Sequence, residues 1–348
     1  MTWLQRHVRP EQIRELSLLL LIVVAIFFFG SLIDGYYTFR TFNRIASSVA
    51  IITVVAVGQT LVVLTRNIDL SVGSIVGFTA YFVGTLIASH NSINPFFAVA
   101  IAILIGAALG VVNGVLVSWG RVPAVVVTLG TLAIYRGVLV DLSGAKTVTT
   151  DSLPQWLIDL PLLNVLPIGS LDIRALFVLA LVIVVLFHLG TIYLSFARRF
   201  YAIGSNPEAA QLIGLPMKSV VFLAFVICGA LSGLGGFMML ARFGNITVEA
   251  GRGLELSVVA AVVVGGVNIF GGSGTVTGAM LGAALIGTLE QSLFRLGISE
   301  FWLNAVLGLL ILLAVASDAI ILQRLRALWT RAELKLIVGA PEKRGTQP

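Results

Sequence analysis

Ten apolar stretches, most of them about 20 residues long, constrain the fold of this chain more than any other feature of its sequence. They cover residues 17–34, 45–65, 68–89, 95–118, 123–141, 173–195, 218–241, 253–269, 273–296 and 302–322. A helix needs about 20 apolar residues to cross the hydrocarbon core of a bilayer. The sequence therefore predicts an all-α, polytopic membrane protein with about ten transmembrane helices. The weakest candidates are 123–141, which contains Arg136, and 253–269, which is short. A broken or partial helix is the alternative for both.

The composition supports a lipid environment for these stretches. Hydrophobic residues make up 58% of the 348 residues and charged residues only 11%, whereas a soluble domain usually carries about 25% charged residues. The 36 glycines include Gly106, Gly110 and Gly114. A spacing of four places small residues on one face of a helix, where two backbones can approach closely. We therefore expect these glycines to pack helices together rather than to carry chemistry.

The residue inventory argues against several classes of function. Cys228 lies in an apolar stretch and has no second cysteine to pair with, and His7, His90 and His188 are scattered along the chain. No metal site is therefore predicted. The sequence GGSGTVTG at 271–278 lacks the lysine and the strand context of a nucleotide-binding loop, so no ATP site and no cofactor are expected. The net charge of +6 lacks the clustered basic stripe of a nucleic-acid-binding surface.

Lysines and arginines predict how the chain is oriented in the membrane. With the N-terminus in the cytoplasm, fourteen of them fall inside and seven outside, in agreement with the positive-inside rule. An even number of helices then places both termini in the cytoplasm. We expect a cytoplasmic segment at 1–16, a transmembrane domain at 17–322 and a basic cytoplasmic tail at 323–348. The outside loop 142–172 is expected to contain a short interfacial helix. The first apolar stretch has no cleavage site after it, which predicts a retained helix.

A weak internal repeat relates two parts of the chain. Asn67-Ile68, followed by Gly73 to Gly77, recurs 201 residues later as Asn268-Ile269, followed by Gly274 to Gly278. Transporters are often built from such repeats. Chance similarity in a chain rich in glycine and valine is an equally weighted alternative.

Polar residues inside or beside the apolar stretches are candidates for a translocation path, because a charge at membrane depth is costly and usually faces protein or water. The candidates are Asn67, Asp69, Ser71, Asn113, Thr128, Thr131, Tyr135, Arg136, Glu255 and Asn268. For Asp69 the sequence favours a capping role at a helix start over direct substrate contact. Intramembrane acids are few, which argues against an ion-coupled secondary carrier without excluding it. No pair of acids and no nucleophile with a base supports an enzyme.

The inside loop 196–217 contains a candidate docking helix. Asn206 is a good N-cap, Pro207 suits the first helical position, and Glu208 favours the positive helix end. Ala209 and Ala210 continue the helix, and Gly214 ends it. A short capped helix between two membrane spans could bind a cytoplasmic partner, and an ordinary connector on the membrane surface is the alternative.

Four segments of the chain resemble sugar-type ABC importer permeases, in the ribose and branched-chain amino acid permease superfamily. They are TRNIDLSVGSIVGF at 65–78, NGVLVSWGRVPAVVVTLGTLAIYRG at 113–137, RRFYAIGSNPEAAQLIGL at 198–215 and GLELSVVAAVVVGGVNIFGGSGTVTGAMLGA at 253–283. Many members of that family have two glycines before IDLSVG, where this chain has Arg66-Asn67. In this respect it is more similar to the permeases for autoinducer-2 and rhamnose-like sugars.

The resemblance implies a permease in a bacterial plasma membrane that moves a monosaccharide inward by alternating access. The implied cargo is autoinducer-2 or a ribose-, xylose- or rhamnose-like sugar. The resemblance also implies ATP-binding subunits docked at 206–214, which hydrolyse the ATP, an identical or homologous second permease, and a sugar-binding protein outside the cell. A branched-chain amino acid permease of the same superfamily is an alternative, although the NIDLSVG segment favours sugar.

Overall fold

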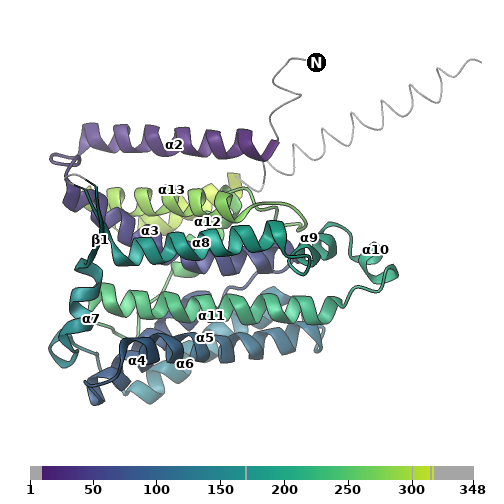
Figure 1. Ribbon diagram of the computed structural model, residues 1–348, viewed down its shortest axis with the longest axis horizontal. Coiled ribbons are helices and arrows are strands. Elements are labelled where there is room, and N and C mark those ends of the chain that lie inside the picture. Colours follow the sequence, from purple (N-terminus) through teal and green to yellow (C-terminus); the bar gives the residue numbers. More distant parts are fainter. Residues whose placement is uncertain (1–9, 169–170, 300, 314–315, 317–348) are drawn as a thin grey trace, which may run out of the picture.

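The computed structural model describes residues 10–168, 171–299, 301–313 and 316, and over this range the chain is almost entirely helical (Figure 1). Each of the ten apolar stretches overlaps one helix. The helices are α2 (Pro10–Leu32), α3 (Phe39–Leu64), α4 (Val72–Ser89), α5 (Pro95–Ser118), α6 (Ala124–Ser143), α8 (Ala175–Tyr193), α11 (Met217–Phe243), α12 (Leu254–Val264), α13 (Val276–Arg295) and Phe301–Leu313. The predicted all-α membrane fold is confirmed. The predicted tail at 323–348 lies outside the described residues.

Seven of the described helices are long and apolar enough to cross a membrane, namely α2, α3, α4, α5, α6, α8 and α11. The stretch at 123–141 forms an unbroken helix of 20 residues, α6, in spite of Arg136. The stretch at 253–269 forms only the 11 residues of α12. Such a helix is about 16 Å long, which is roughly half of a hydrocarbon core. The partial-helix alternative therefore holds for α12 and fails for α6.

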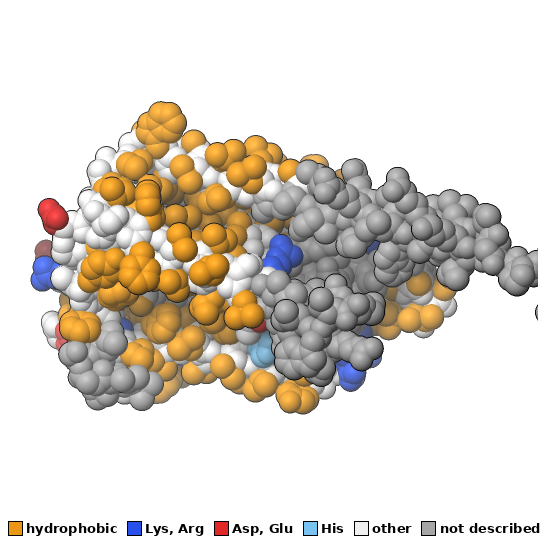
Figure 2. Space-filling model, turned by 90° about the horizontal axis from the view of Figure 1, so that it is seen from above, with side chains coloured by type: hydrophobic (Ala, Val, Ile, Leu, Met, Phe, Trp, Pro, Cys, Tyr) orange, Lys and Arg blue, Asp and Glu red, His pale blue; other side chains and the backbone are white. Residues whose placement is uncertain are grey.

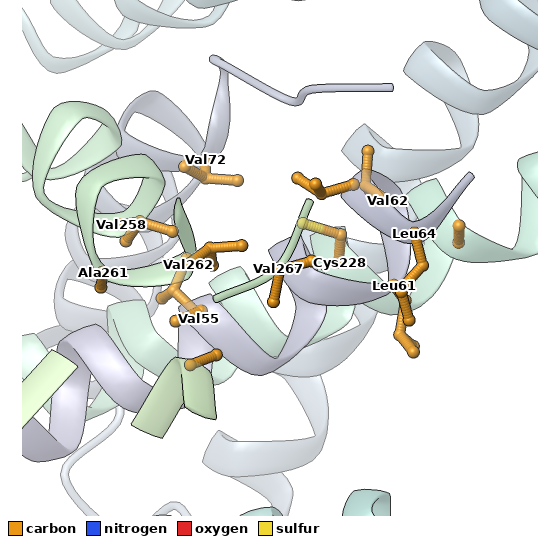
Figure 3. Packing of buried hydrophobic residues seen from close by; sticks show 14 of the residues in the cluster. Val55, Leu61, Val62, Leu64, Val72, Cys228, Val258, Ala261, Val262 and Val267 are labelled. Atoms are coloured by element: carbon orange, nitrogen blue, oxygen red, sulfur yellow. The ribbon is translucent and has the colours of Figure 1, made fainter. Parts of the chain in front are cut away.

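The long helices lie side by side, with α3, α4 and α11 inside the bundle. The predicted glycine packing is confirmed where α5 crosses α11. A Cβ atom on Gly106 would lie 2.2 Å from the carbonyl oxygen of Gly229, and one on Gly233 would lie 2.1 Å from that of Ala102. Figure 3 shows part of the core formed by α3, α11 and α12 around the buried thiol of Cys228. The small side chains on α5 and α11 bring these two backbones into contact.

The outer helices present apolar side chains to their surroundings. On α2, Leu20 is 64% exposed and Phe27 is 65% exposed. In Figure 2, which views the side of the molecule where α2 lies, hydrophobic side chains cover most of the described surface. Such a surface would be unfavourable in water and suits contact with lipid or with another membrane subunit.

Connections between the helices gather at two opposite ends of the bundle (Figure 1). One end holds α9 (Arg198–Ser205) and α10 (Pro207–Leu212), and α2 starts there. We call it the α10 end. The opposite, α7 end holds α7 (Gln155–Asp159) and an antiparallel pair of strands, β1 (Asn164–Ile168) and β2 (Leu171–Arg174). The short helix predicted in loop 142–172 corresponds to α7, whereas the strand pair was not predicted.

The repeated sequence segments form two similar helix ends. At the end of α3 the amide of Asn67 donates to the carbonyl of Val62 (3.2 Å), and at the end of α12 the amide of Val267 donates to that of Val262 (3.1 Å). The residue before each donor has a positive φ, 67° at Arg66 and 98° at Gly266. This is the common motif that ends a helix with a left-handed residue. The helix ends are 200 residues apart, one fewer than the offset of the sequence repeat.

Candidate functional site

The α9–α10 segment forms a projection at one end of the bundle (Figure 1). The side chain of Asn206 accepts a hydrogen bond from the amide of Ala209 (3.0 Å), and Pro207 occupies the first turn of α10. These two predicted features of the docking helix are confirmed. Gly214, with φ of 74°, follows the helix. The segment therefore folds as a compact, locally determined unit.

The outer surface of α10 combines charge with exposed apolar side chains. Glu208 and Ala209 are exposed, whereas Ala210 is buried against the bundle. Leu212 is 88% exposed and Ile213 is 74% exposed. Two adjacent, exposed large aliphatic residues at the tip of a projection suit contact with another protein or with the membrane surface.

Six of the predicted path residues meet in one buried cluster between α4, α5 and α6. They are Asp69, Ser71, Asn113, Thr128, Thr131 and Tyr135. The Asp69 carboxylate accepts hydrogen bonds from the Ser71 amide (2.9 Å) and hydroxyl (2.6 Å), and Asn113 donates to the same hydroxyl (2.7 Å). With its amide oriented to satisfy both groups, Gln59 donates to the Asp69 carbonyl (3.2 Å) and accepts from the Asp69 amide (3.1 Å).

This cluster supplies hydrogen bonds to the irregular backbone between α3 and α4. Thr128 donates to the carbonyl of Ile68 (3.3 Å). Tyr135 donates instead to the carbonyl of Leu109 within α5 (2.9 Å), a bond between α6 and α5. Buried backbone groups outside a helix need such partners, particularly in a membrane protein. The expected role of Asp69 as the helix cap is wrong in its detail: Ser71 is the N-cap of α4 and has no side-chain cap bond, and Asp69 accepts from the Ser71 amide instead. Gln59 is a member of the cluster that the sequence did not reveal.

Asn67 and Asn268 lie in the two turns at the α10 end, apart from this cluster. The side-chain amide of Asn67 donates to the backbone carbonyl of Thr65 (2.9 Å), and the side-chain oxygen of Asn268 accepts from the backbone amide of Phe270 (2.9 Å). Each asparagine thus stabilises the turn in which it stands.

A non-helical segment at 244–253 joins α11 to α12 and runs along α4. A Cβ atom on Gly77 would lie 2.1 Å from the carbonyl oxygen of Ala250, and one on Gly73 would lie 2.5 Å from that of Gly251. The glycines of α4 therefore leave room for a second backbone. Gly244, Gly251 and Gly253 have positive φ angles, which glycine adopts without steric cost.

Arg136 and Glu255 both bind the backbone of this segment. Arg136 donates to the carbonyls of Val248 (2.8 Å) and Ala250 (2.7 Å), and Glu255 accepts from the amide of Gly253 (3.3 Å). Among the described residues, no ion pair joins Arg136 to Glu255. Non-helical backbone at membrane depth is tolerated where protein groups satisfy it or where it borders a wet cavity. Here Arg136 and Glu255 provide hydrogen bonds to the segment, which also borders two cavities.

Two adjoining cavities lie beside the segment, toward the α7 end. The larger has a volume of about 760 Å³ and is lined by residues 245–247, 249–253, 255 and 256, with Met239, Phe243, Phe301 and Asn304. The smaller, of about 250 Å³, extends between α3, α11 and α13 and is lined in part by Ser48, Ser257, Glu290, Gln291 and Asn304.

The lining of these cavities combines neutral hydrogen-bonding groups with the charged side chains of Arg242, Glu249, Arg252, Glu255 and Glu290. Gln291 donates to the hydroxyl of Ser48 (3.3 Å), and Ser257 donates to Glu290. The exposed pair Arg252–Glu249 (2.5 Å) stands at the rim. Hydroxyl, amide and aromatic groups together suit a small neutral molecule with several hydroxyl groups.

Of the predicted path residues, only Glu255 lines either cavity. The other lining residues come from positions between 48 and 304, with no spacing that would have revealed them. The available signal was the short, glycine-bounded apolar stretch at 253–269, because interrupted membrane helices often border binding sites.

Comparison with known proteins is consistent with this arrangement. Residues 41–315 match the family described as "Branched-chain amino acid transport system / permease component". An autoinducer 2 import system permease protein LsrC from Yersinia enterocolitica is 38% identical over 307 residues, which cover 86% of this chain and 81% of the relative.

Proteins of the same name from two further species are similarly related. The one from Yersinia pseudotuberculosis (strain YPIII) is 37% identical over 308 residues, and the one from Yersinia pestis (strain Pestoides F) is 37% identical over 312 residues. Each alignment covers 88% of this chain and 84% of the relative. No solved structure matches the chain. Because the matched region extends from α3 through α13 and includes the α10 projection, the buried cluster and both cavities, the chain belongs to the branched-chain amino acid transport system permease family.

Proposed function

We propose that this chain is the membrane-spanning permease of an ATP-driven importer that carries autoinducer-2, or a similar small sugar-like molecule, across a bacterial inner membrane. The observation that carries the proposal is the placement of two features at opposite ends of one bundle. A capped helix with exposed Leu212 and Ile213 projects at one end, and cavities whose lining includes hydroxyl, amide and charged groups lie toward the other. The importer permeases named above are 37–38% identical over most of the chain.

The α10 end faces the cytoplasm in this proposal, together with both termini. ATP-binding subunits dock on the surface formed by Asn206 to Gly214 and hydrolyse ATP, so this chain is not itself an enzyme. A second permease, identical or homologous, completes the membrane channel. The exposed apolar faces of the outer helices are available for it.

The cavities at the α7 end receive the substrate from a soluble binding protein outside the cell. Alternating access then carries it past the buried polar cluster at Asp69 toward the turns that contain Asn67 and Asn268. A neutral polyol requires donors and acceptors along this path rather than a cage of charges. The relatives' names favour this importer over an ion-coupled secondary carrier.

A branched-chain amino acid is the second candidate substrate, because the family description names it. An amino acid carries two charges, and the Arg252–Glu249 pair at the rim could separate to bind both. Uptake of leucine that competes with uptake of autoinducer-2 would favour this candidate.

The test is purification of the tagged chain from native membranes in mild detergent, with every partner identified by mass. We expect an ATP-binding subunit, and its loss when residues 205–214 are disrupted. A chain that purifies alone and transports after ATP is depleted would overturn the proposal.

A further inference from the structure

Arg66 has a backbone conformation that arginine rarely adopts. Its φ is 67°, and it is one of three non-glycine residues with positive φ in the described part of the chain, with Arg121 and Ala145. A side chain at such an angle is sterically unfavourable, and glycine would remove the strain. Strain of this kind persists where the surrounding structure fixes the residue, and it often marks a functional contact.

The strained backbone places the Arg66 guanidinium on the last carbonyls of α9. Its Nε donates to the carbonyl of Gly204 (2.5 Å), and its Nη2 donates to that of Ser205 (2.9 Å). These carbonyls stand at the C-terminus of a helix, where a cation is favourable and intrahelical partners are lacking. Ser205 immediately precedes Asn206, the N-cap of α10. Arg66 therefore holds the junction through which α10 is attached to the bundle.

Three segments from distant parts of the sequence meet at this junction. A Cβ atom on Gly204 would lie only 1.8 Å from the carbonyl oxygen of Leu64, at the end of α3. The same oxygen accepts a hydrogen bond from the amide of Gly272 (3.0 Å), in the turn before α13. Tyr201 of α9 donates to the carbonyl of Gly274 in that turn (3.2 Å).

The two turns at the junction lead directly to the parts of the molecule that would handle the substrate. The turn that contains Arg66 continues through Asp69 into α4. The turn that contains Gly272 follows α12, whose far end supplies Gly253 and Glu255 to the larger cavity. Short, packed segments therefore connect α9 to the buried cluster and to residues that line the larger cavity.

We propose that Arg66 is a positioning residue that couples movement of α10 to the turns before α4 and α13. The inference rests on the proposed function, since it assigns to α10 a partner that moves it. Two charge-assisted bonds from one planar group fix orientation as well as distance. Without them, α9 and α10 can shift against the end of α3 while the docking surface of α10 stays intact.

The experiment compares Arg66→Gly with Arg121→Gly in the importer reconstituted with its ATP-binding subunits and binding protein. Arg121 is a matched control, because it is an exposed arginine with φ of 56° in the turn between α5 and α6. No hydrogen bond from its side chain occurs within the described residues. Both exchanges relieve the same backbone strain and remove one positive charge. The measured quantity is uptake per ATP hydrolysed, with radiolabelled ribose and autoinducer-2 as separate probes.

We expect Arg66→Gly to reach the membrane and to retain its ATP-binding subunits and ATP hydrolysis. Uptake per ATP should fall by at least about five-fold, as the loss of a charge-assisted hydrogen bond would predict. Arg121→Gly should keep the parent ratio. Arg66→Lys should give an intermediate ratio, because a lysine ammonium keeps the charge but lacks the planar fork.

Equal ratios for Arg66→Gly and Arg121→Gly would overturn the proposal. If Arg66→Gly fails to accumulate in the membrane, Arg66→Lys is the deciding variant. Uptake per ATP equal to that of the unaltered chain would overturn the proposal, and a lower uptake per ATP would support it. Failure of both variants to accumulate would make Arg66 a folding residue and would also overturn it. A parent chain that binds no ATP-binding subunit would refute the proposed function itself, before any variant is compared.

Discussion

Charged side chains inside this bundle mainly hold backbone that is not helical. Arg136 binds two carbonyls of the 244–253 segment, and Asp69 accepts a hydrogen bond from the Ser71 amide just before α4. A buried charge is costly unless it is paired or hydrogen-bonded. At both positions it meets backbone groups that would otherwise be unsatisfied. The cost of each charge is therefore offset by the irregular structure that it permits.

Replacement of Arg136 with alanine should destabilise the protein, because two partly buried carbonyls lose their donors. We expect a loss of at least about 2 kcal/mol in the free energy of unfolding, measured by thermal unfolding in detergent. Arg252→Ala is the control, because its ion pair with Glu249 is exposed and should contribute about 1 kcal/mol or less. Equal losses in the two variants would contradict this role of Arg136.

Asn304 lines both cavities, which makes it the residue with which to probe substrate contact. Asn304→Leu keeps a similar volume and removes the amide. The loss of about one hydrogen bond should raise the half-saturating concentration for uptake roughly ten-fold, while ATP hydrolysis continues. Asn164→Leu, at an exposed position on β1, should leave uptake unchanged. Unaltered saturation in Asn304→Leu would exclude these cavities from the transport path.

Among the elements, length and local sequence were enough to predict some, but not all, of what the structure contains. The apolar stretches predicted each long helix, and Asn206-Pro207 predicted the start of α10, because these signals act within one turn of helix. The bonds of Arg136 to Val248 and Ala250 span more than a hundred residues, so no local pattern could pair them. The bonds between Gln59 and Asp69 join residues that are close in the sequence, but they form only because of the irregular backbone path between α3 and α4, which no local pattern predicts.

The packing of α5 on α11 gives a prediction about single methyl groups. Gly106→Ala would place a Cβ atom 2.2 Å from the carbonyl oxygen of Gly229, so the two helices must separate. We expect a large drop in the amount of folded protein in the membrane. Gly130→Ala in α6 is the matched control, because nothing lies within 4 Å of its Cβ position. It should be neutral, or stabilising by up to about 1 kcal/mol through helix propensity.

The exposed aliphatic tip of α10 gives a prediction about assembly. Leu212→Lys should abolish co-purification of the ATP-binding subunit, because a charge replaces an apolar anchor at an interface. The chain should still reach the membrane, since Leu212 is 88% exposed and supports no core packing. Leu163→Lys, at a 55% exposed position at the α7 end, should leave assembly intact. Retention of the subunit by Leu212→Lys would argue that α10 is only a connector.

At the scale of the whole molecule, the two candidate sites lie at opposite ends of one bundle: the α10 projection at one end and the cavities toward the other. The end with α10 is built from tight turns and glycine contacts, whereas the cavities at the other end border backbone without helical hydrogen bonds. Sequence alone indicated the first end through its motifs. The second end depends on residues between 48 and 304 that only the complete fold brings together.

The way in which the non-helical segment 244–253 is held bears on how often this segment opens. In the described structure, the long-range hydrogen bonds that hold residues 246–250 are two from Arg136 and two between Ile246 and Val148. At a net value of about 1 kcal/mol for each bond, these four bonds contribute only a few kcal/mol, and the burial of Ile246, which is 1% exposed, adds to the cost of releasing the segment. An open form would then be present in fewer than about one molecule in a thousand at rest. Local openings of this kind occur within microseconds to seconds, so the segment can open and close again without the unfolding of any helix.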